Sequence, residues 1–157
     1  MKKIYFFLAV SLLALSTSAS AQLKPFSIGL YGEVGMPTGD FGKGFNTGFG
    51  GGLTADFNLP VGFGITGSAG YMHFPGKISG TKLSAIPIRA GIKYKVAMVY
   101  FKVEGGVASI SNGGGSPFIV SPGIGVKLLK FDVQAKYEVW AQNNSLAFWG
   151  GRVAFHF

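Results

Sequence analysis

The sequence of 157 residues has no cysteine, so we expect no disulfide and no lipid anchor on a cysteine. Charged residues make up 13% of the chain, which is few for a soluble domain. Beyond residue 21 there is no apolar run of the roughly 20 residues that a membrane helix needs. These absences leave two classes of protein, a soluble β-sandwich or barrel and a membrane β-barrel.

The first 21 residues have the pattern of a secretory signal peptide. Lys2 and Lys3 precede an apolar run over residues 4–15, which is too short to span a bilayer. Ala19 and Ala21 then form the small-x-small pattern of a signal-peptidase site. We predict cleavage after Ala21, with a signal peptide at residues 1–21 and one outer-membrane β-barrel domain at residues 22–157.

Eight later segments alternate between apolar residues and small or polar residues, which is typical of β-strands with one apolar face. They cover residues 26–36, 48–57, 61–71, 86–94, 99–107, 118–127, 131–140 and 147–157. The pattern predicts an all-β fold, an eight-stranded antiparallel up-and-down transmembrane barrel.

The connections between these segments alternate in length. Longer connections at residues 37–46, 73–82, 109–117 and 142–145 alternate with tight turns at residues 58–60, 95–97 and 128–130. Outer-membrane barrels have long extracellular loops and short periplasmic turns, so we expect both termini on the periplasmic side. Pro87 and Pro122 fall inside predicted strands, where each removes a ladder hydrogen bond, and we expect bulges or local bends there.

The distribution of charge separates the two classes of protein. The apolar faces of the eight segments carry no Asp, Glu, Lys or Arg. This favours a membrane barrel, because a charge that faces lipid at mid-bilayer costs about 2–4 kcal/mol. A soluble barrel would instead expose a face rich in Gly, Ser and Thr and poor in solubilising charge. We therefore expect a lumen charge network formed by Glu33, Asp56, Arg89, Lys93, Lys102, Glu104, Lys127, Asp132, Lys136, Glu138 and Arg152.

Two stretches carry a resemblance to a known family. The chain ends in Val153, Phe155 and Phe157, which resembles the C-terminal signature of outer-membrane barrels, and that signature implies recognition by the barrel-assembly machinery. Residues 37–41 and 48–52 resemble the first loop and second strand of the small bacterial outer-membrane β-barrel domain family. That family is abundant in Bacteroidota and often described as porin-like, and the architecture also resembles OmpA/OmpX-type barrels. The resemblance implies a protein of the Gram-negative cell envelope.

Candidate sites are few. His73 in a predicted loop can be combined with Ser79 or Asp40, as in barrels that modify lipid A, but no motif fixes that arrangement, so we expect no catalysis. His156 is predicted to fill the lumen. No ligand spacing indicates a metal or cofactor site, and the basic residues are too scattered for nucleic-acid binding. On the outer side, Lys43, Lys77 and Lys82 are expected to attract the phosphates of lipopolysaccharide.

The sequence thus predicts a monomeric outer-membrane barrel with a structural, envelope or surface-interaction role and a lumen filled by side chains. One alternative is a narrow porin-like channel or transporter for small solutes, which needs a continuous water path. The other is a secreted soluble ligand-binding barrel of lipocalin type, which needs an apolar interior.

Overall fold

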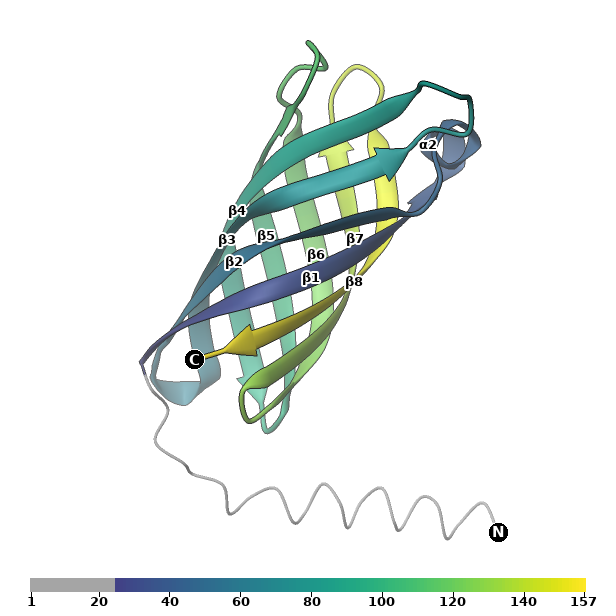
Figure 1. The fold of residues 1–157 in the computed structure, drawn as a ribbon. Helices are drawn as coiled ribbons and strands as arrows, with labels where there is room; N and C mark the ends of the chain where they lie inside the picture. Colours follow the sequence, from purple (N-terminus) through teal and green to yellow (C-terminus); the bar gives the residue numbers. More distant parts are fainter. Residues whose placement is uncertain (1–24) are drawn as a thin grey trace, which may run out of the picture.

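A computed structural model describes residues 25–157 as one closed barrel (Figure 1). Each strand pairs antiparallel with the next one along the chain, and β8 returns to β1. The strands are β1 (Phe26–Thr38), β2 (Gly48–Asn58), β3 (Phe63–Pro75), β4 (Lys82–Val96), β5 (Val99–Ile110), β6 (Phe118–Leu128), β7 (Phe131–Ala141) and β8 (Leu146–His156). The predicted fold class is confirmed. No helix in residues 25–157 has the length and hydropathy of a membrane span.

The barrel has two unlike ends. The end with the short turns, which we call the turn end, carries residues 59–62, 97–98 and 129–130 and both described chain ends. The opposite end, the loop end, carries residues 39–47, 76–81, 111–117 and 142–145. The first of these loops contains the short helix α2 (Gly39–Gly44). Because β1 and β8 pair along their length, the barrel leaves no open sheet edge.

Period-2 alternation decides which side chains point inward. Within each strand, buried and exposed residues alternate, and the exposed positions carry apolar residues such as Phe101, Val133 and Val153. This is the reverse of a soluble barrel, in which the apolar face would be inside. On the outward face of the described strands, Lys82 is the one charged residue, and it lies at the loop-end start of β4.

The predicted strand boundaries differ from the observed ones, most of all at β3 and β4. β3 continues to Pro75 and β4 begins at Lys82, so His73 and Lys82 lie in strands and the connection between them spans only residues 76–81. The alternation continues because Met72 and Phe74 are buried inside the barrel, which outweighs the turn-like composition of this stretch. Val61 was predicted to begin a strand but lies in the 3₁₀ turn Pro60–Gly62.

The prolines do not produce bulges. On the two sides of Pro87 the β3–β4 pairs Ala69↔Ile88 and Met72↔Ala85 keep one register. A bulge would shift that register by one residue. Around Pro122 the β6–β7 register is likewise unchanged between the pairs Val120↔Val139 and Gly123↔Lys136. At each proline, two residue pairs are missing from one ladder, and the register on both sides is unchanged. A proline lacks only its backbone N–H donor, so the strand needs no extra residue to accommodate it.

Candidate functional site

The lumen is the only part of the described chain in which charged side chains are gathered in numbers. From the turn end to the loop end, its side chains form three layers. We call them the turn-end layer, the middle layer and the apolar layer. All eleven residues predicted for the lumen charge network lie on the inner face. Ten of them are buried, and Lys127, near the turn end, keeps 14% of its side chain exposed.

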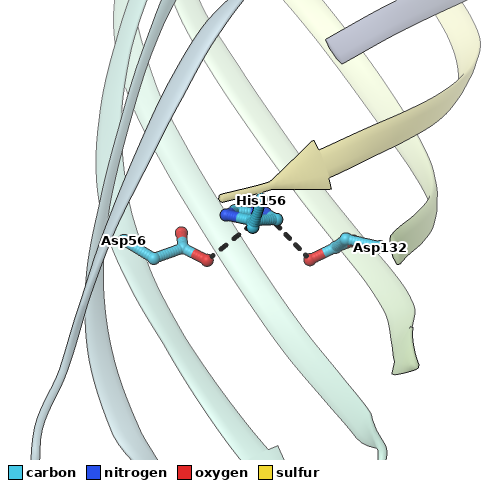
Figure 2. A group of neighbouring side chains, drawn as sticks. All are labelled: Asp56, Asp132 and His156. Atoms are coloured by element: carbon cyan, nitrogen blue, oxygen red, sulfur yellow. Dashed lines mark ion pairs between the residues drawn. The ribbon is translucent and has the colours of Figure 1, made fainter. Parts of the chain in front are cut away.

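The turn-end layer surrounds His156, the penultimate residue. Its Nε2 lies 3.8 Å from Asp56 Oδ2 and 3.9 Å from Asp132 Oδ2 (Figure 2). Its Nδ1 lies 3.3 Å from the hydroxyl of Ser27. The Tyr100 hydroxyl donates a hydrogen bond to Asp132. His156 therefore joins strands β1, β2 and β7 from its place at the end of β8.

This group could offer three ligand atoms to a metal ion, since Asp56, Asp132 and His156 each place one within 4.8 Å of the others. Two lysines already supply positive charge at that point. Asp56 Oδ2 lies 2.5 Å from Lys93 Nζ and 3.4 Å from Lys127 Nζ. We therefore assign no metal here. The distances from His156 Nε2 to the carboxylates are also too long for the hydrogen bond that a Ser-His-Asp triad requires.

The middle layer is centred on Glu33, which contacts three cations. Its carboxylate oxygens lie 3.2 Å from Arg89 Nη2, 2.8 Å from Lys136 Nζ and 2.8 Å from Arg152 Nη2. Glu138 binds the first two again, at 2.6 Å from Arg89 Nη2 and 2.6 Å from Lys136 Nζ. These residues come from β1, β4, β7 and β8, so the ion pairs connect opposite walls of the barrel. Such groups are tolerated in a buried site only because each charge has partners.

Glu104 and Lys102 complete the middle layer on β5. Glu104 Oε2 lies 3.4 Å from Lys102 Nζ and 3.7 Å from Arg152 Nη1. Neither contact is a hydrogen bond, and both carboxylate oxygens of Glu104 lack a hydrogen-bond partner within the protein. The middle layer is therefore well paired around Glu33 and Glu138 and loosely paired around Glu104.

The apolar layer fills the lumen at the loop end. Its ring contacts include Phe74–Phe148 at 5.3 Å, Trp140–Phe148 at 5.7 Å and Phe41–Phe74 at 5.0 Å between centroids. The Trp140 indole N–H donates a 2.6 Å hydrogen bond to Glu138, which joins this layer to the middle one. The buried members are Phe41, Met72, Phe74, Ala85, Ala108, Ile119, Trp140 and Phe148.

Helix α2 places Phe41 over this layer. The helix contains three glycines among its six residues, so it has little intrinsic stability. It is held by its contacts with the neighbouring turn, where Lys77 Nζ donates to the Gly42 carbonyl at 2.6 Å and Lys77 N donates to the Gly44 carbonyl at 2.9 Å. Sequence reasoning missed the apolar layer because its members come from six strands and from helix α2, which carries Phe41.

The remaining predicted residues lie apart from the lumen layers. His73 is in β3, where its Nδ1 lies 2.9 Å from the Ser84 hydroxyl of β4, and among residues 25–157 no carboxylate forms an ion pair with it. It is therefore not joined to Ser79 or Asp40. Val153 and Phe155 lie on the outer face of β8, and the Phe155 ring makes edge-to-face contacts with Phe131 and Phe157. The predicted cleavage residues Ala19 and Ala21 lie outside the described residues.

By sequence, the chain matches no protein-family profile and no curated protein. By structure, it is similar to a de novo designed transmembrane β-barrel, with a TM-score of 0.60, 18% identity, and coverage of 85% of this chain and 98% of the other. It is also similar to Ail of Yersinia pestis, solved with the heparin analogue sucrose octasulfate, with a TM-score of 0.58, 17% identity, and coverage of 84% and 97%. For the N-terminal β-barrel domain of Pseudomonas aeruginosa OprF the TM-score is 0.60, the identity 12% and the coverage 83% and 97%.

The closed sheet, the apolar outer face and the buried ions together define a small transmembrane β-barrel of eight strands. Among natural proteins it shares this fold with Ail and with the OprF barrel domain, each of which it covers almost completely.

Proposed function

We propose that this chain is an outer-membrane barrel whose role is structural or interactive, with a closed lumen and no catalytic or cofactor chemistry. The barrel anchors the loop end at the cell surface, works as a monomer and binds no nucleic acid. Both termini face the periplasm in this proposal, after export through the cleaved signal peptide. The terminal residues Val153, Phe155 and Phe157 serve as the signature for the barrel-assembly machinery.

The apolar layer is the observation that carries this proposal. A channel needs a continuous water path, but here the loop end of the lumen is filled by aromatic and aliphatic side chains in mutual contact. Below it, Arg89 and Glu138 lie in the centre of the barrel with fully buried side chains. The porin-like alternative therefore lacks a path through the barrel. The lipocalin-type alternative needs an apolar cavity, whereas the apolar part of this lumen is filled by side chains in contact and the rest is lined by charged residues.

Conductance in planar lipid bilayers tests the closed lumen. The protein should show no large, steady openings, because an eight-stranded barrel filled in this way has no aqueous channel. As a positive control, Phe41→Ala combined with Phe74→Ala shortens the apolar layer and should increase the frequency of brief openings. Steady openings of the unaltered protein would contradict the proposal.

Fractionation tests the location. The mature chain should remain with outer membranes and require detergent for extraction, and an unboiled sample should migrate differently from a boiled one on a gel. A chain that is recovered in buffer without detergent would favour the soluble alternative.

The loop end supports an interaction with anionic glycolipid. Loop-end charges among the described residues are one acid, Asp40, and three lysines, Lys43, Lys77 and Lys82. Their sum is positive, and all three lysines are exposed. One protein of the same fold, Ail, was solved with a polysulfated ligand, although that likeness concerns the fold alone. The phosphates of lipopolysaccharide have the charge and the position to meet these lysines.

A triple substitution tests this surface. Changing Lys43, Lys77 and Lys82 to Gln should abolish any gain in thermal stability that lipopolysaccharide gives over phospholipid vesicles. The matched control changes Lys95 and Lys130 at the turn end to Gln and should keep that gain. An equal gain in both variants would show that the loop-end lysines do not bind the glycolipid.

A further inference from the structure

We propose that the outer face of β3 and β4 binds one phosphate monoester of a lipid A-type glycolipid, at a lateral site formed by His73, Ser84 and Lys82. The inference rests on the proposed function, because it needs the loop end to lie in the outer leaflet. It goes further by placing the phosphate against the barrel wall rather than on the loops. On the outward face of the described strands, this is the one place where a charged residue and a histidine lie together.

The register of β3 and β4 brings the three residues together. His73 pairs with Ser84, and Pro75 pairs with Lys82, so Lys82 lies one row nearer the loop end on the same face. Lys82 is thus a diagonal neighbour of His73, a separation that long side chains can bridge. The His73 and Ser84 side chains are half-buried and Lys82 is exposed, so all three are accessible from the outside of the barrel.

The His73–Ser84 pair has one hydrogen-bond donor to spare. His73 Nδ1 lies 2.9 Å from the Ser84 hydroxyl. A neutral imidazole carries one N–H and the serine one O–H, and the bond between them uses one of these two donors. If the hydroxyl donates to Nδ1, the Nε2–H is left, and in the other tautomer the hydroxyl is left. In either case the pair offers a donor to an acceptor outside the protein.

The charge around this pair favours an anion. Among residues 25–157 the loop end has one acid, Asp40, and it pairs with Lys43 at 2.8 Å. No carboxylate in that part of the chain forms an ion pair with Lys82 or His73, so the Lys82 ammonium is available to a ligand. A phosphate monoester offers three acceptor oxygens, which suits one ammonium and one neutral donor side by side.

The position of the pair matches the depth of lipid phosphates. One row nearer the turn end, Tyr71 and Ile86 are each 50% exposed and belong to the apolar outer face. Tyrosine gathers where a membrane meets water, so the row above Tyr71 lies among the headgroups. The opposite wall differs, because the outward residues Val139 and Ala147 pair at the loop end of β7 and β8 and are both apolar. The site is therefore local to one wall.

Native mass spectrometry of the detergent-solubilised barrel tests the site, with diphosphoryl lipid A as the probe. The double change His73→Leu with Ser84→Ala keeps every loop-end lysine and makes the outer face more apolar, so the barrel should still fold. It should weaken binding of the first lipid A molecule by about tenfold, as expected for the loss of a hydrogen bond to a charged group. Lys82→Gln should weaken binding by a similar factor. The control Tyr137→Leu, on the outer face of β7, should keep the wild-type affinity.

Equal binding of lipid A by the wild-type protein and the double variant would refute the lateral site. The glycolipid interaction of the proposed function would then stand alone if the triple lysine variant still lost binding, whereas no binding by the wild-type protein would refute both. Inorganic phosphate that displaces lipid A at equal concentration would show that the site takes free phosphate and not a lipid. Should the double variant lack the gel shift of a folded barrel, Lys82→Gln decides alone, because Lys82 is exposed.

Discussion

The middle layer and the apolar layer of the lumen are equally buried and chemically opposite. In the middle layer, Glu33 is held by three cations from three other strands. In the apolar layer, Phe74 contacts Phe41, Trp140 and Phe148 through ring edges and faces. The position of a side chain in the middle layer depends on its charged partners. In the apolar layer it depends on the shape and volume of the side chain. The barrel thus fills its interior by two different means.

The two layers should respond differently to substitution. Removing one member of an ion network leaves other charges buried without partners, and these cannot relax into water. Removing part of an apolar side chain leaves a cavity whose cost grows with its volume. The predictions below compare the layers by urea unfolding in phospholipid vesicles.

The largest effect is expected for Glu33→Gln. The substitution preserves shape but removes the charge that Arg89, Lys136 and Arg152 share. The free energy of unfolding should fall by about 5 kcal/mol, the upper part of the range for breaking a buried ion pair. If the free energy of unfolding fell by less than it does for Met72→Ala, the ion network would contribute little to folding.

Met72→Ala should have the next largest effect. Met72 is buried in the apolar layer, against Gly50 and close to the position of Gly35. Truncation should lower the free energy of unfolding by about 3 kcal/mol through lost burial and a cavity. It should also leave the charged layers intact. Dependence of this loss on salt concentration would contradict the separation of the two layers.

Ile119→Val tests the packing of the apolar layer more finely. Ile119 is fully buried on β6, opposite Trp140 of β7 in the register. Loss of one methyl group should cost about 1 kcal/mol if the layer is packed as tightly as a protein core. An unchanged stability would indicate that the loop end is loosely filled.

Asp40→Asn should have the smallest effect. Asp40 pairs with Lys43 at 2.8 Å, but both side chains are largely exposed. Exposed ion pairs contribute little because water and salt screen them. The unfolding midpoint should stay within measurement error of the unaltered protein, which makes this variant a control for Glu33→Gln.

Strand identity and the direction of side chains could be predicted because period-2 alternation depends on local sequence alone. Glu104 and Lys136, for example, alternate with apolar neighbours, and both lie inside the barrel. The number of strands followed from turn residues such as Asn58 and Pro60. These features need no knowledge of which strands pair.

Which side chains meet across the strands could not be predicted, because that depends on register. Nothing local in the sequence joins Arg89 to Glu138 or Ser27 to His156. The apolar layer was missed for the same reason. The end of β3 and the start of β4 were misplaced because Pro75 and Gly76 resemble a loop. The prolines were misjudged, because loss of ladder pairs on one side is enough to accommodate them.

The most direct test of the account uses the two tryptophans of the chain, which point in opposite directions. Trp149 lies on the outer face with 55% of its surface exposed, and Trp140 is fully buried in the apolar layer. In vesicles of lipids brominated near the headgroup end of the acyl chain, Trp140→Phe should leave a fluorescence that bromine quenches strongly. Trp149→Phe should leave one that is barely quenched. Strong quenching of Trp140 together with protection of Trp149 would mean that the faces are reversed, and the barrel would not span a membrane as described.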